Sequence, residues 1–202
     1  MAAAQPPDAR QVRAVFDDET IVVYQAYGDR IADRALLAQR FMPPFKLDRM
    51  TWIKPSFLWM MYRSGWGTKL DQERVLAITI SRAGFDWALE RSSLSHFDPS
   101  VHASHEAWAR QRDSSPVRIQ WDPERSLNLG AQPRRAIQIG LSGDAARRYV
   151  HSWIREIAEV TSLAREIQAL VANGDAAGAS SLLPAERVYP LGDGVRARIG
   201  AT

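Results

Sequence analysis

Residues 49–66 read RMTWIKPSFLWMMYRSGW, a run with three tryptophans and three methionines around a single lysine, Lys54. Lysine is scarce in this chain, because Lys46 and Lys69 are the only others. An unpaired ammonium buried among aromatic side chains is costly. The run therefore indicates either a site where Lys54 meets an anionic ligand with a flat base, or an aromatic core helix whose charged groups reach solvent at its ends.

The same run predicts a short strand followed by a helix. We expect a strand over residues 50–53, and Pro55 favours an extended backbone at Lys54. Pro55 and Ser56 are typical of a first helical turn, so a helix should run to about Arg63. The glycines at positions 65 and 67 should end it.

Around this unit the spacing of apolar residues predicts further elements. Strands are expected at residues 12–16, 20–26, 74–81, 117–121 and 136–141. Helices are expected at residues 30–40, 85–91 and 144–171, the last with a break at Thr161 and Ser162 as an alternative. Segment 96–115 is polar and predicts no regular element. Because the strands neither alternate strictly with helices nor occur without them, the expected fold class is α+β.

Length and composition predict one domain with a substantial core. The chain has 202 residues, of which 46% are hydrophobic and 24% charged. We expect a disordered leader at residues 1–10, a single α+β domain at 11–172 and a loosely packed C-terminal tail at 173–202. The tail is assigned because alanine, glycine and serine accumulate there.

Composition also excludes several classes of protein. The absence of cysteine excludes disulfides, zinc–cysteine sites and thiol catalysis, and it fits a cytoplasmic location. No apolar run approaches the roughly 18 residues that span a bilayer, so no membrane partner is expected. The formal charge of +3 permits contact with RNA but does not require it.

Four motifs resemble the family called domain of unknown function 4291. The resemblance extends over roughly residues 11–171 and implies a fold related to the ADP-ribosyltransferases, with a split β-sheet, flanking helices and a long C-terminal helix. It also implies an enzyme that removes ADP-ribose from RNA rather than adding it. The motifs are VYQAY (23–27), RMTWIKPSFLWMMYRSGWGTK (49–69), VRIQWDPER (117–125) and IQIGLSG (137–143).

The resemblance places the nucleotide site on three strands. It implies ligand contacts from Tyr24 and Gln25 at the end of an early strand, and from Thr51 at the start of the central motif. A late strand of the transferases carries a catalytic glutamate, where this chain has Gln138. A neutral amide stabilises a developing oxocarbenium ion less well than a carboxylate, so the departure favours a hydrolase or a non-catalytic binding protein. Gln120 and Gln138 join the expected substrate-binding residues.

The positive charges of the central motif suggest a diphosphate clamp. Arg49 and Arg63 offer planar donor forks, and Lys54 offers a compact charge. Ser56 and the backbone N–H groups after Pro55 would add a helix N-terminus for the same anion. The alternative is solvated charge paired with acidic neighbours at positions 48 or 71.

One or two tryptophans are expected to stack on adenine or on an RNA base, which contributes roughly 1–3 kcal/mol per base. The candidates are Trp52, Trp59, Trp66 and Trp121, of which Trp52 and Trp59 are assigned to the substrate-binding residues. The alternative for each is a place in the core.

Asp122 follows a predicted strand and is the first candidate for a catalytic carboxylate, which would activate water or stabilise an oxocarbenium ion. It is equally compatible with a turn before a proline. Asp98 is the second catalytic candidate, with a turn as its alternative.

No metal or redox cofactor is expected. The spacing of His96, His102 and His105 matches no compact ligand pair for zinc. The chain has no Walker-type loop, no Gly-x-Gly-x-x-Gly and no Gly-x-Ser-x-Gly elbow, which removes the main support for ATPase, dehydrogenase and α/β-hydrolase functions.

The sequence therefore predicts an ADP-ribosyl hydrolase that acts on RNA, with Lys54 and the two aspartates as catalytic residues. A non-catalytic module that binds a nucleotide or RNA remains the alternative, and an NAD-dependent ADP-ribosyltransferase is a third. The expected partner is ADP-ribose or a related nucleotide, and the sequence does not set an oligomeric state.

Overall fold

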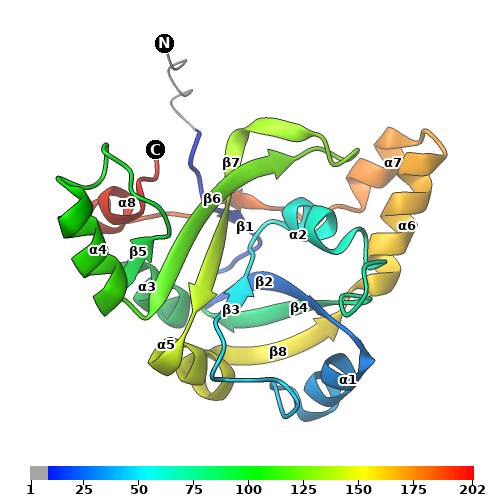
Figure 1. The fold of residues 1–202 in the computed structure, drawn as a ribbon. Helices are drawn as coiled ribbons and strands as arrows, with labels where there is room; N and C mark the ends of the chain where they lie inside the picture. The colour runs from blue at the N-terminus through cyan, green and yellow to red at the C-terminus, as the bar shows by residue number, and fades with distance from the viewer. Residues whose placement is uncertain (1–8) are drawn as a thin grey trace.

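Two β-sheets carry the fold in the computed structural model, which describes residues 9–202 (Figure 1). The first is antiparallel throughout and contains β2 (Thr20–Tyr27), β4 (Arg74–Ser81) and β8 (Ile154–Glu159) in that order. The second has the order β3-β7-β6-β5, and only its β5–β6 pair is parallel. Its strands are β3 (Thr51–Ile53), β7 (Ala131–Leu141), β6 (Val117–Arg125) and β5 (Ser92–Leu94).

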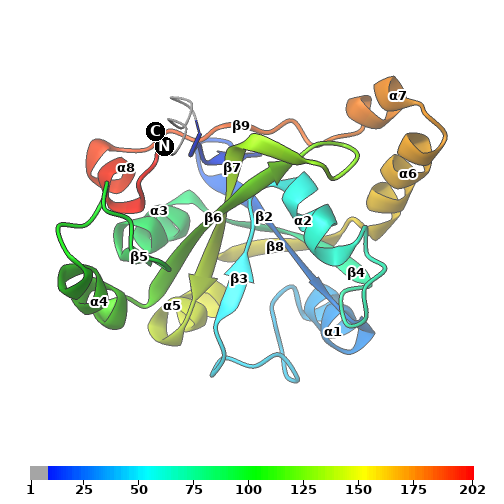
Figure 2. The ribbon, with the colours of Figure 1, turned by 45° about the horizontal axis from the view of Figure 1, so that its top comes forward.

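The two sheets are joined by one bridge between Tyr24 and Lys54. The Tyr24 amide donates to the Lys54 carbonyl at 2.7 Å, and the Lys54 amide donates back at 3.3 Å. β2 and β3 spread apart below this point, as Figure 2 shows. The residues that continue each strand past the bridge therefore face one another across an opening.

Helix α2 (Phe57–Ser64) follows β3 and fixes the other side of the junction. Its N-terminus is capped by Ser56, whose Oγ accepts the Trp59 amide at 3.2 Å, and Gly65 ends it with a φ of 61°. Phe57 and the methionines of its buried face pack in one cluster with Tyr24. The predicted strand and helix of residues 50–63 are confirmed.

The remaining helices surround the sheets (Figure 1). Those that border the first sheet or extend from it are α1 (Asp29–Ala38), α6 (Thr161–Ala172) and α7 (Ala176–Ser181). The others are α3 (Arg82–Glu90), α4 (His105–Ser114), α5 (Gly143–Arg148), α8 (Asp193–Ile199) and a π-helical turn at Tyr149–Trp153.

The main core lies between the two sheets. Val23 and Ile78 of the first sheet belong to the same buried cluster as Ile119 and Ile139 of the second, and none of these four side chains is more than 1% exposed. The α+β class and the single domain are confirmed. The strands expected at 20–26 and 74–81 and the helices expected at 30–40 and 85–91 are present within a few residues.

The helix expected over residues 144–171 is present only at its two ends, as α5 and as α6, which begins at the expected break at Thr161. Its middle is β8, in which Ile157 pairs with Ile78 and is buried in the core. Without this strand, one edge of β4 would leave backbone groups unpaired, and that requirement outweighs a weak helical preference. Arg74 on β4 also donates to Glu159 twice at 2.6 Å, which fixes the end of the strand.

The tail expected to be loose is instead packed. β9 (Arg187–Val188) pairs with β1 (Arg13–Ala14), the short remnant of the strand expected at 12–16. Tyr189 is 2% exposed and donates to the Asp86 carboxylate at 2.7 Å, while Ile199 is fully buried. Few but large apolar residues hold this segment, so its small-residue composition was misleading.

Two further expectations need correction. Segment 96–115 contains α4, whose N-terminus is capped by Ser104 and which has no buried residue, so no apolar pattern marked it. Residues 1–8 of the expected disordered leader lie outside the described part of the chain. The last two leader residues are ordered, since Ala9 is 1% exposed and Arg10 bridges to Arg135.

Gly84 tests whether residues 149–153 pack on α3 as described. A Cβ at Gly84 would collide with the indole ring of Trp153. We expect Gly84→Ala to destabilise the fold by about 1–3 kcal/mol in urea unfolding, although alanine is the better helix former. Gly194→Ala in α8 meets nothing within 4 Å and should stabilise the protein by up to about 1 kcal/mol. Equal stability of the two variants would contradict the packing of Trp153.

Candidate functional site

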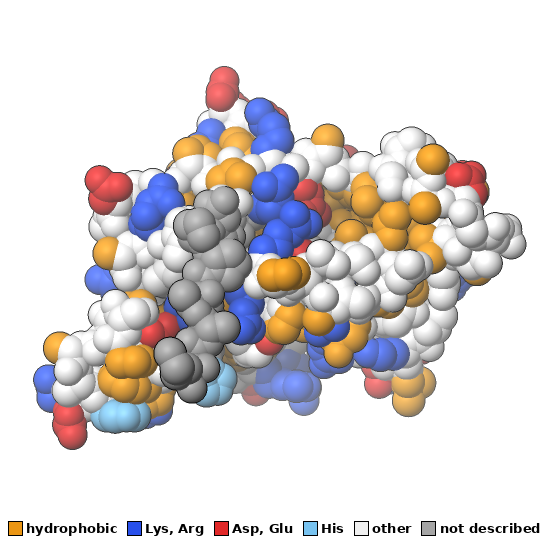
Figure 3. Space-filling model, turned by 90° about the horizontal axis from the view of Figure 1, so that it is seen from above, with side chains coloured by type: hydrophobic (Ala, Val, Ile, Leu, Met, Phe, Trp, Pro, Cys, Tyr) orange, Lys and Arg blue, Asp and Glu red, His pale blue; other side chains and the backbone are white. Residues whose placement is uncertain are grey.

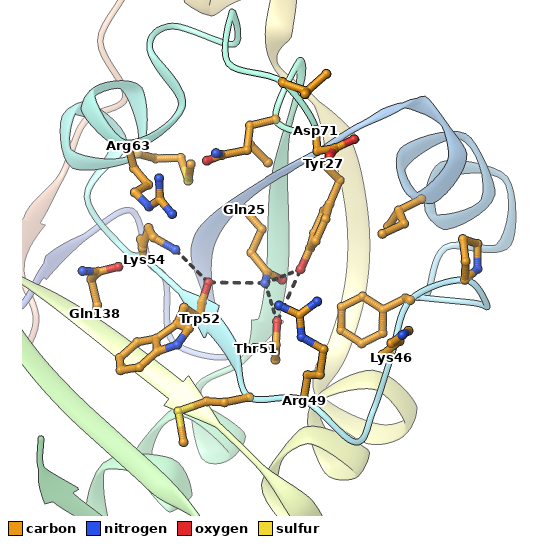
Figure 4. A pocket seen from close by; sticks show the side chains of 18 of the residues that line it. Gln25, Tyr27, Lys46, Arg49, Thr51, Trp52, Lys54, Arg63, Asp71 and Gln138 are labelled. Carbon is orange, nitrogen blue, oxygen red and sulfur yellow. Dashed lines mark hydrogen bonds between the residues drawn. The ribbon is translucent and has the colours of Figure 1, made fainter.

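A cavity of about 790 Å³ opens where β2 and β3 separate (Figure 4). Its wall combines the diverging strands, α2, the β6–β7 pair and two loops. Many of the residues predicted for the site line it, namely Gln25, Arg49, Thr51, Trp52, Lys54, Arg63, Gln120 and Gln138. The others are Ala26, Tyr27, Ile31, Pro44, Phe45, Lys46, Met50, Met60, Leu70, Asp71 and Gln72.

Gln25 ties the two strands together at the top of the cavity. Its Nε2 donates to the Thr51 hydroxyl at 2.7 Å and to the Tyr27 hydroxyl at 2.8 Å. Its Oε1 accepts the Tyr149 hydroxyl at 2.7 Å. The side chain is 3% exposed, so this network satisfies a buried amide and fixes the shape of the opening.

Lys54 is buried at 6% exposure, yet its side chain reaches the cavity. Its Nζ donates to the Trp52 carbonyl at 2.9 Å, as Figure 4 shows. Burial, with the nearby Arg63 charge, lowers the pKa of Lys54 from 10.5 to about 7, and Asp122 opposes this only in part. Near pH 7, a large fraction of the molecules therefore carries Lys54 as a neutral amine. The predicted role as a phosphate clamp needs a permanent cation, so a nucleophile or base fits Lys54 better.

Asp122 lies behind the cavity wall and is held by two glutamines. Its Oδ2 accepts Gln138 Nε2 at 2.6 Å and its Oδ1 accepts Gln120 Nε2 at 3.0 Å. Gln120 and Gln138 are opposite one another on β6 and β7. The neutral residue at position 138 is thus bonded to a carboxylate from the neighbouring strand. Asp122 influences Lys54 through its charge rather than by contact.

Arg49 and Arg63 supply permanent positive charge at the cavity. Both side chains are exposed, and neither forms an ion pair within residues 9–202. The pairing with Asp48 or Asp71 that was the alternative is therefore not seen in this part of the chain. Two free guanidinium groups in one cavity suit an anionic ligand such as a diphosphate.

Tyr24 and Trp59 belong to the core rather than to the cavity. Tyr24 is 3% exposed and packs edge to face on Phe57, with ring centroids 5.5 Å apart. Trp59 is 5% exposed and stacks on Tyr62. Both predicted contacts with the ligand are absent from the cavity lining, because strand and helix periodicity turns these two side chains to the opposite face.

Ser56 lines a second, smaller cavity of about 160 Å³ on the other side of the Lys54–Ser56 segment. Its hydroxyl donates to Glu124 Oε1 at 2.9 Å, and the first amide of α2, on Phe57, donates to Glu186 at 2.7 Å. Carboxylates therefore occupy the helix N-terminus that was expected to bind the ligand's phosphates. The pKa of Glu186 is raised to about 8, chiefly by burial.

Figure 3 views the face with the β6–β7 hairpin and shows basic side chains gathered in its middle. Arg13 and Arg134 line the second cavity. Neither forms an ion pair within the described residues, although two glutamates line the same cavity. Apart from Ser56, this cavity contains none of the predicted nucleotide-binding residues, and it shares no lining residue with the main cavity.

Asp98 lies outside both cavities and is used structurally. Its Oδ2 accepts Arg10 at 2.6 Å and its Oδ1 accepts the Ser100 hydroxyl at 2.6 Å. Burial alone would raise the pKa of Asp98, but these bonds outweigh it and lower the pKa. The nearby His102 is bonded to the Asp98 carbonyl. Among residues 9–202, no three His, Cys, Asp or Glu side chains are placed to hold a metal ion.

Comparison with known families fits the central motif. The family model described as "Domain of unknown function (DUF4291)" matches residues 11–189. The chain belongs to this family. No curated protein matches it. The match extends past the expected domain end at residue 172, in agreement with the packed tail. Within the described residues, no helix is both long and apolar enough to cross a membrane.

Some cavity residues of this DUF4291 member escaped the sequence analysis. Tyr27 lies two residues after Gln25 on β2 and therefore faces the same side of the sheet, so strand periodicity was a usable signal for it. Tyr149 reaches Gln25 from a segment assigned to the wrong helix, and no local signal could have placed it. Phe45 and Asp71 come from loops, where sequence gives residue type but not position.

Lys54→Met tests the buried amine of the DUF4291 site. In the unfolded chain Lys54 keeps its proton up to its ordinary pKa of 10.5, whereas the folded protein loses it near 7. Unfolding therefore takes up a proton between these values, and stability rises with pH. We expect wild type to gain on the order of 2 kcal/mol relative to Lys54→Met between about pH 7 and pH 9.

The measurement is urea unfolding of both proteins across that pH range. Lys46→Met, which removes an exposed lysine from the same cavity, serves as the control. A difference between wild type and Lys54→Met that stays constant with pH would show that Lys54 remains charged.

Proposed function

We propose that this protein hydrolyses the bond between ADP-ribose and RNA, with Lys54 as its nucleophile. The observation that carries the proposal is a buried lysine side chain that lines the same cavity as two arginines without ion pairs in the described structure, and this burial lowers the pKa of Lys54 to about 7. Such a shift is typical of lysines that act through their neutral amine. The resemblance of the central motif supplies ADP-ribose and RNA as the substrate class.

The size and charge of the cavity support this substrate. A volume of about 790 Å³ is at the upper end of ligand-binding pockets and can admit a dinucleotide-sized molecule. Arg49 and Arg63 would bind the diphosphate, since guanidinium groups donate two parallel bonds to phosphate oxygens. Gln120 and Gln138 direct their Nε2 atoms to Asp122, which leaves their oxygens to accept ribose hydroxyls. Figure 4 shows the Gln138 amide oxygen on the Lys54 side.

The proposed reaction has two stages. The Lys54 amine forms a bond to C1 of the distal ribose, and the bond from C1 to the acceptor atom of the RNA breaks with its electron pair. The acceptor takes a proton from water, and Nζ gives up a proton to water. The ribose ring then opens to an imine, to which water adds, and this releases free ADP-ribose and the neutral amine. The net reaction consumes one water.

Asp122 would stabilise the positive charge that develops at C1 and at Nζ. Its carboxylate acts from behind Gln120 and Gln138 and already favours the charged form of Lys54. One feature favours the alternative of a non-catalytic nucleotide-binding module. Asp122 does not line the cavity, and each of its carboxylate oxygens accepts a glutamine amide, so it is placed as a support for Gln120 and Gln138.

Covalent trapping distinguishes these functions. We expect borohydride to reduce the imine during turnover of ADP-ribosylated RNA and to leave ADP-ribose attached at Lys54, as read by peptide mass spectrometry. Lys54→Ala should lose the adduct and lower hydrolysis by about a hundredfold or more, whereas Lys46→Ala should retain both. Lys54→Met, which keeps the apolar stem, separates loss of the amine from loss of packing.

Three outcomes would contradict the proposal. Hydrolysis that survives in Lys54→Ala would remove Lys54 as the nucleophile. Tight binding of ADP-ribose without any release from RNA would establish the binding module instead. Transfer of ADP-ribose from NAD to RNA or protein would establish a transferase.

A further inference from the structure

The end of the main cavity away from Lys54 has a different character. Figure 4 shows Lys54, Arg63 and Gln138 on one side and Lys46, Tyr27 and Asp71 on the other. The lining near the latter group includes apolar side chains from the loop before β3, from α1 and from the loop after α2. These are Ile31, Pro44, Phe45 and Leu70.

Phe45 provides a flat and fixed wall at this end. One face of its ring is stacked on Phe41, with centroids 4.5 Å apart and an interplanar angle of 21°. Tyr27 meets it edge to face at 6.0 Å. Phe41 is buried, so the Phe45 ring is backed by the core while its own side chain lines the cavity. A ring supported in this way suits stacking by a second flat ring.

Leu70 lies at the cavity rim and is 82% exposed. An isolated exposed leucine needs no explanation on an open surface. Here it lines the same cavity as Phe45 and directly precedes Asp71, so an apolar ligand bound at this end would remove both apolar side chains from water. Burial of apolar area of this kind stabilises a complex.

Asp71 brings an acceptor to the same end. Within residues 9–202 its carboxylate accepts no hydrogen bond and forms no ion pair, whereas its backbone amide donates to Glu73 at 3.0 Å. Its φ of 61° is in the left-handed region, which aspartate and asparagine adopt more readily than most residues. The loop thus presents a free carboxylate beside an apolar slot.

We infer that this end of the cavity binds the adenine ring, stacked on Phe45 below Leu70, with its 6-amino group donating to Asp71. This adenine site rests on the proposed function, and it sets the orientation of the bound ADP-ribose. Adenine lies at the Phe45 end, the diphosphate passes Arg49, and the distal ribose reaches Lys54. The RNA then leaves the cavity from the Lys54 end.

This orientation of the ligand predicts a preference for adenine over hypoxanthine. A 6-amino group donates to a carboxylate, whereas the 6-oxo group of hypoxanthine would place one acceptor against another. Loss of a hydrogen bond to a charged group reduces affinity by about tenfold or more. Wild type should therefore bind ADP-ribose about tenfold more tightly than the analogue with hypoxanthine in place of adenine.

Calorimetry on the full chain with these two ligands and ribose 5-phosphate tests the inference. Asp71→Asn should lose or invert the preference, because the amide can donate to a 6-oxo group and tolerates the same backbone conformation. Phe45→Ala should weaken binding of ADP-ribose and of its hypoxanthine analogue by about tenfold while leaving ribose 5-phosphate unchanged. Asp48→Asn and Leu37→Ala alter exposed residues outside the cavity and serve as matched controls.

The outcomes separate this inference from the proposed function. Equal affinity of wild type for ADP-ribose and its hypoxanthine analogue, or a preference retained in Asp71→Asn, would overturn the adenine site. Either result would leave trapping at Lys54 intact as a test of the hydrolase. Failure of wild type to bind ADP-ribose at all would overturn both proposals.

Discussion

The backbone bridge between Tyr24 and Lys54 is the constraint on which the rest of the structure depends. Among the described residues it is the one backbone bridge between the two sheets, and beyond it the backbones separate while the Gln25 side chain still bonds to β3. The separation creates the cavity, and the second residue of the bridge sends its side chain into it. Pro55 and the cap of α2 follow at once, which fixes the direction in which Lys54 leaves the backbone. Lys54 thus joins the two sheets through its backbone and supplies the candidate reactive group through its side chain.

The two buried polar side chains next to the bridge differ in how fully they are hydrogen-bonded, so that Gln25 stabilises the structure while Lys54 is available for chemistry. The Gln25 amide uses its donors and its acceptor within the protein, so it holds the strands and has little left for a ligand. Lys54 has one carbonyl as its partner, and no carboxylate within ion-pairing distance in the described structure. Removing such a group from water without a full set of partners is unfavourable for its charged form. The same burial that would be a defect in a structural lysine makes this one a candidate nucleophile.

Local signals in the sequence predicted the strand and helix around Lys54, the β2 and β4 strands, and many of the cavity residues. Proline, serine and glycine at the ends of α2 start and end the helix through contacts within one turn, so the sequence alone predicted its bounds. The predictions failed where contacts between residues far apart in the sequence determine the secondary structure or the direction of a side chain. β8 forms because β4 needs a partner. Ser56 faces away from the main cavity because its hydroxyl donates to Glu124 of β6, while Glu186 of the C-terminal segment accepts the Phe57 amide. Asp98 resembled a catalytic residue until Arg10, nearly ninety positions away, proved to be its partner.

The account requires Lys54 to be a neutral amine near pH 7, and its proton can be followed directly. The chain contains three lysines, so ¹³C-lysine labelling gives few signals, and Lys54→Met identifies the one that matters. Titration of the Lys54 ε-carbon by NMR should show a midpoint near the pKa of about 7. A midpoint near the ordinary lysine pKa of 10.5 would contradict the account, because a permanently charged Lys54 would be a binding group rather than a nucleophile.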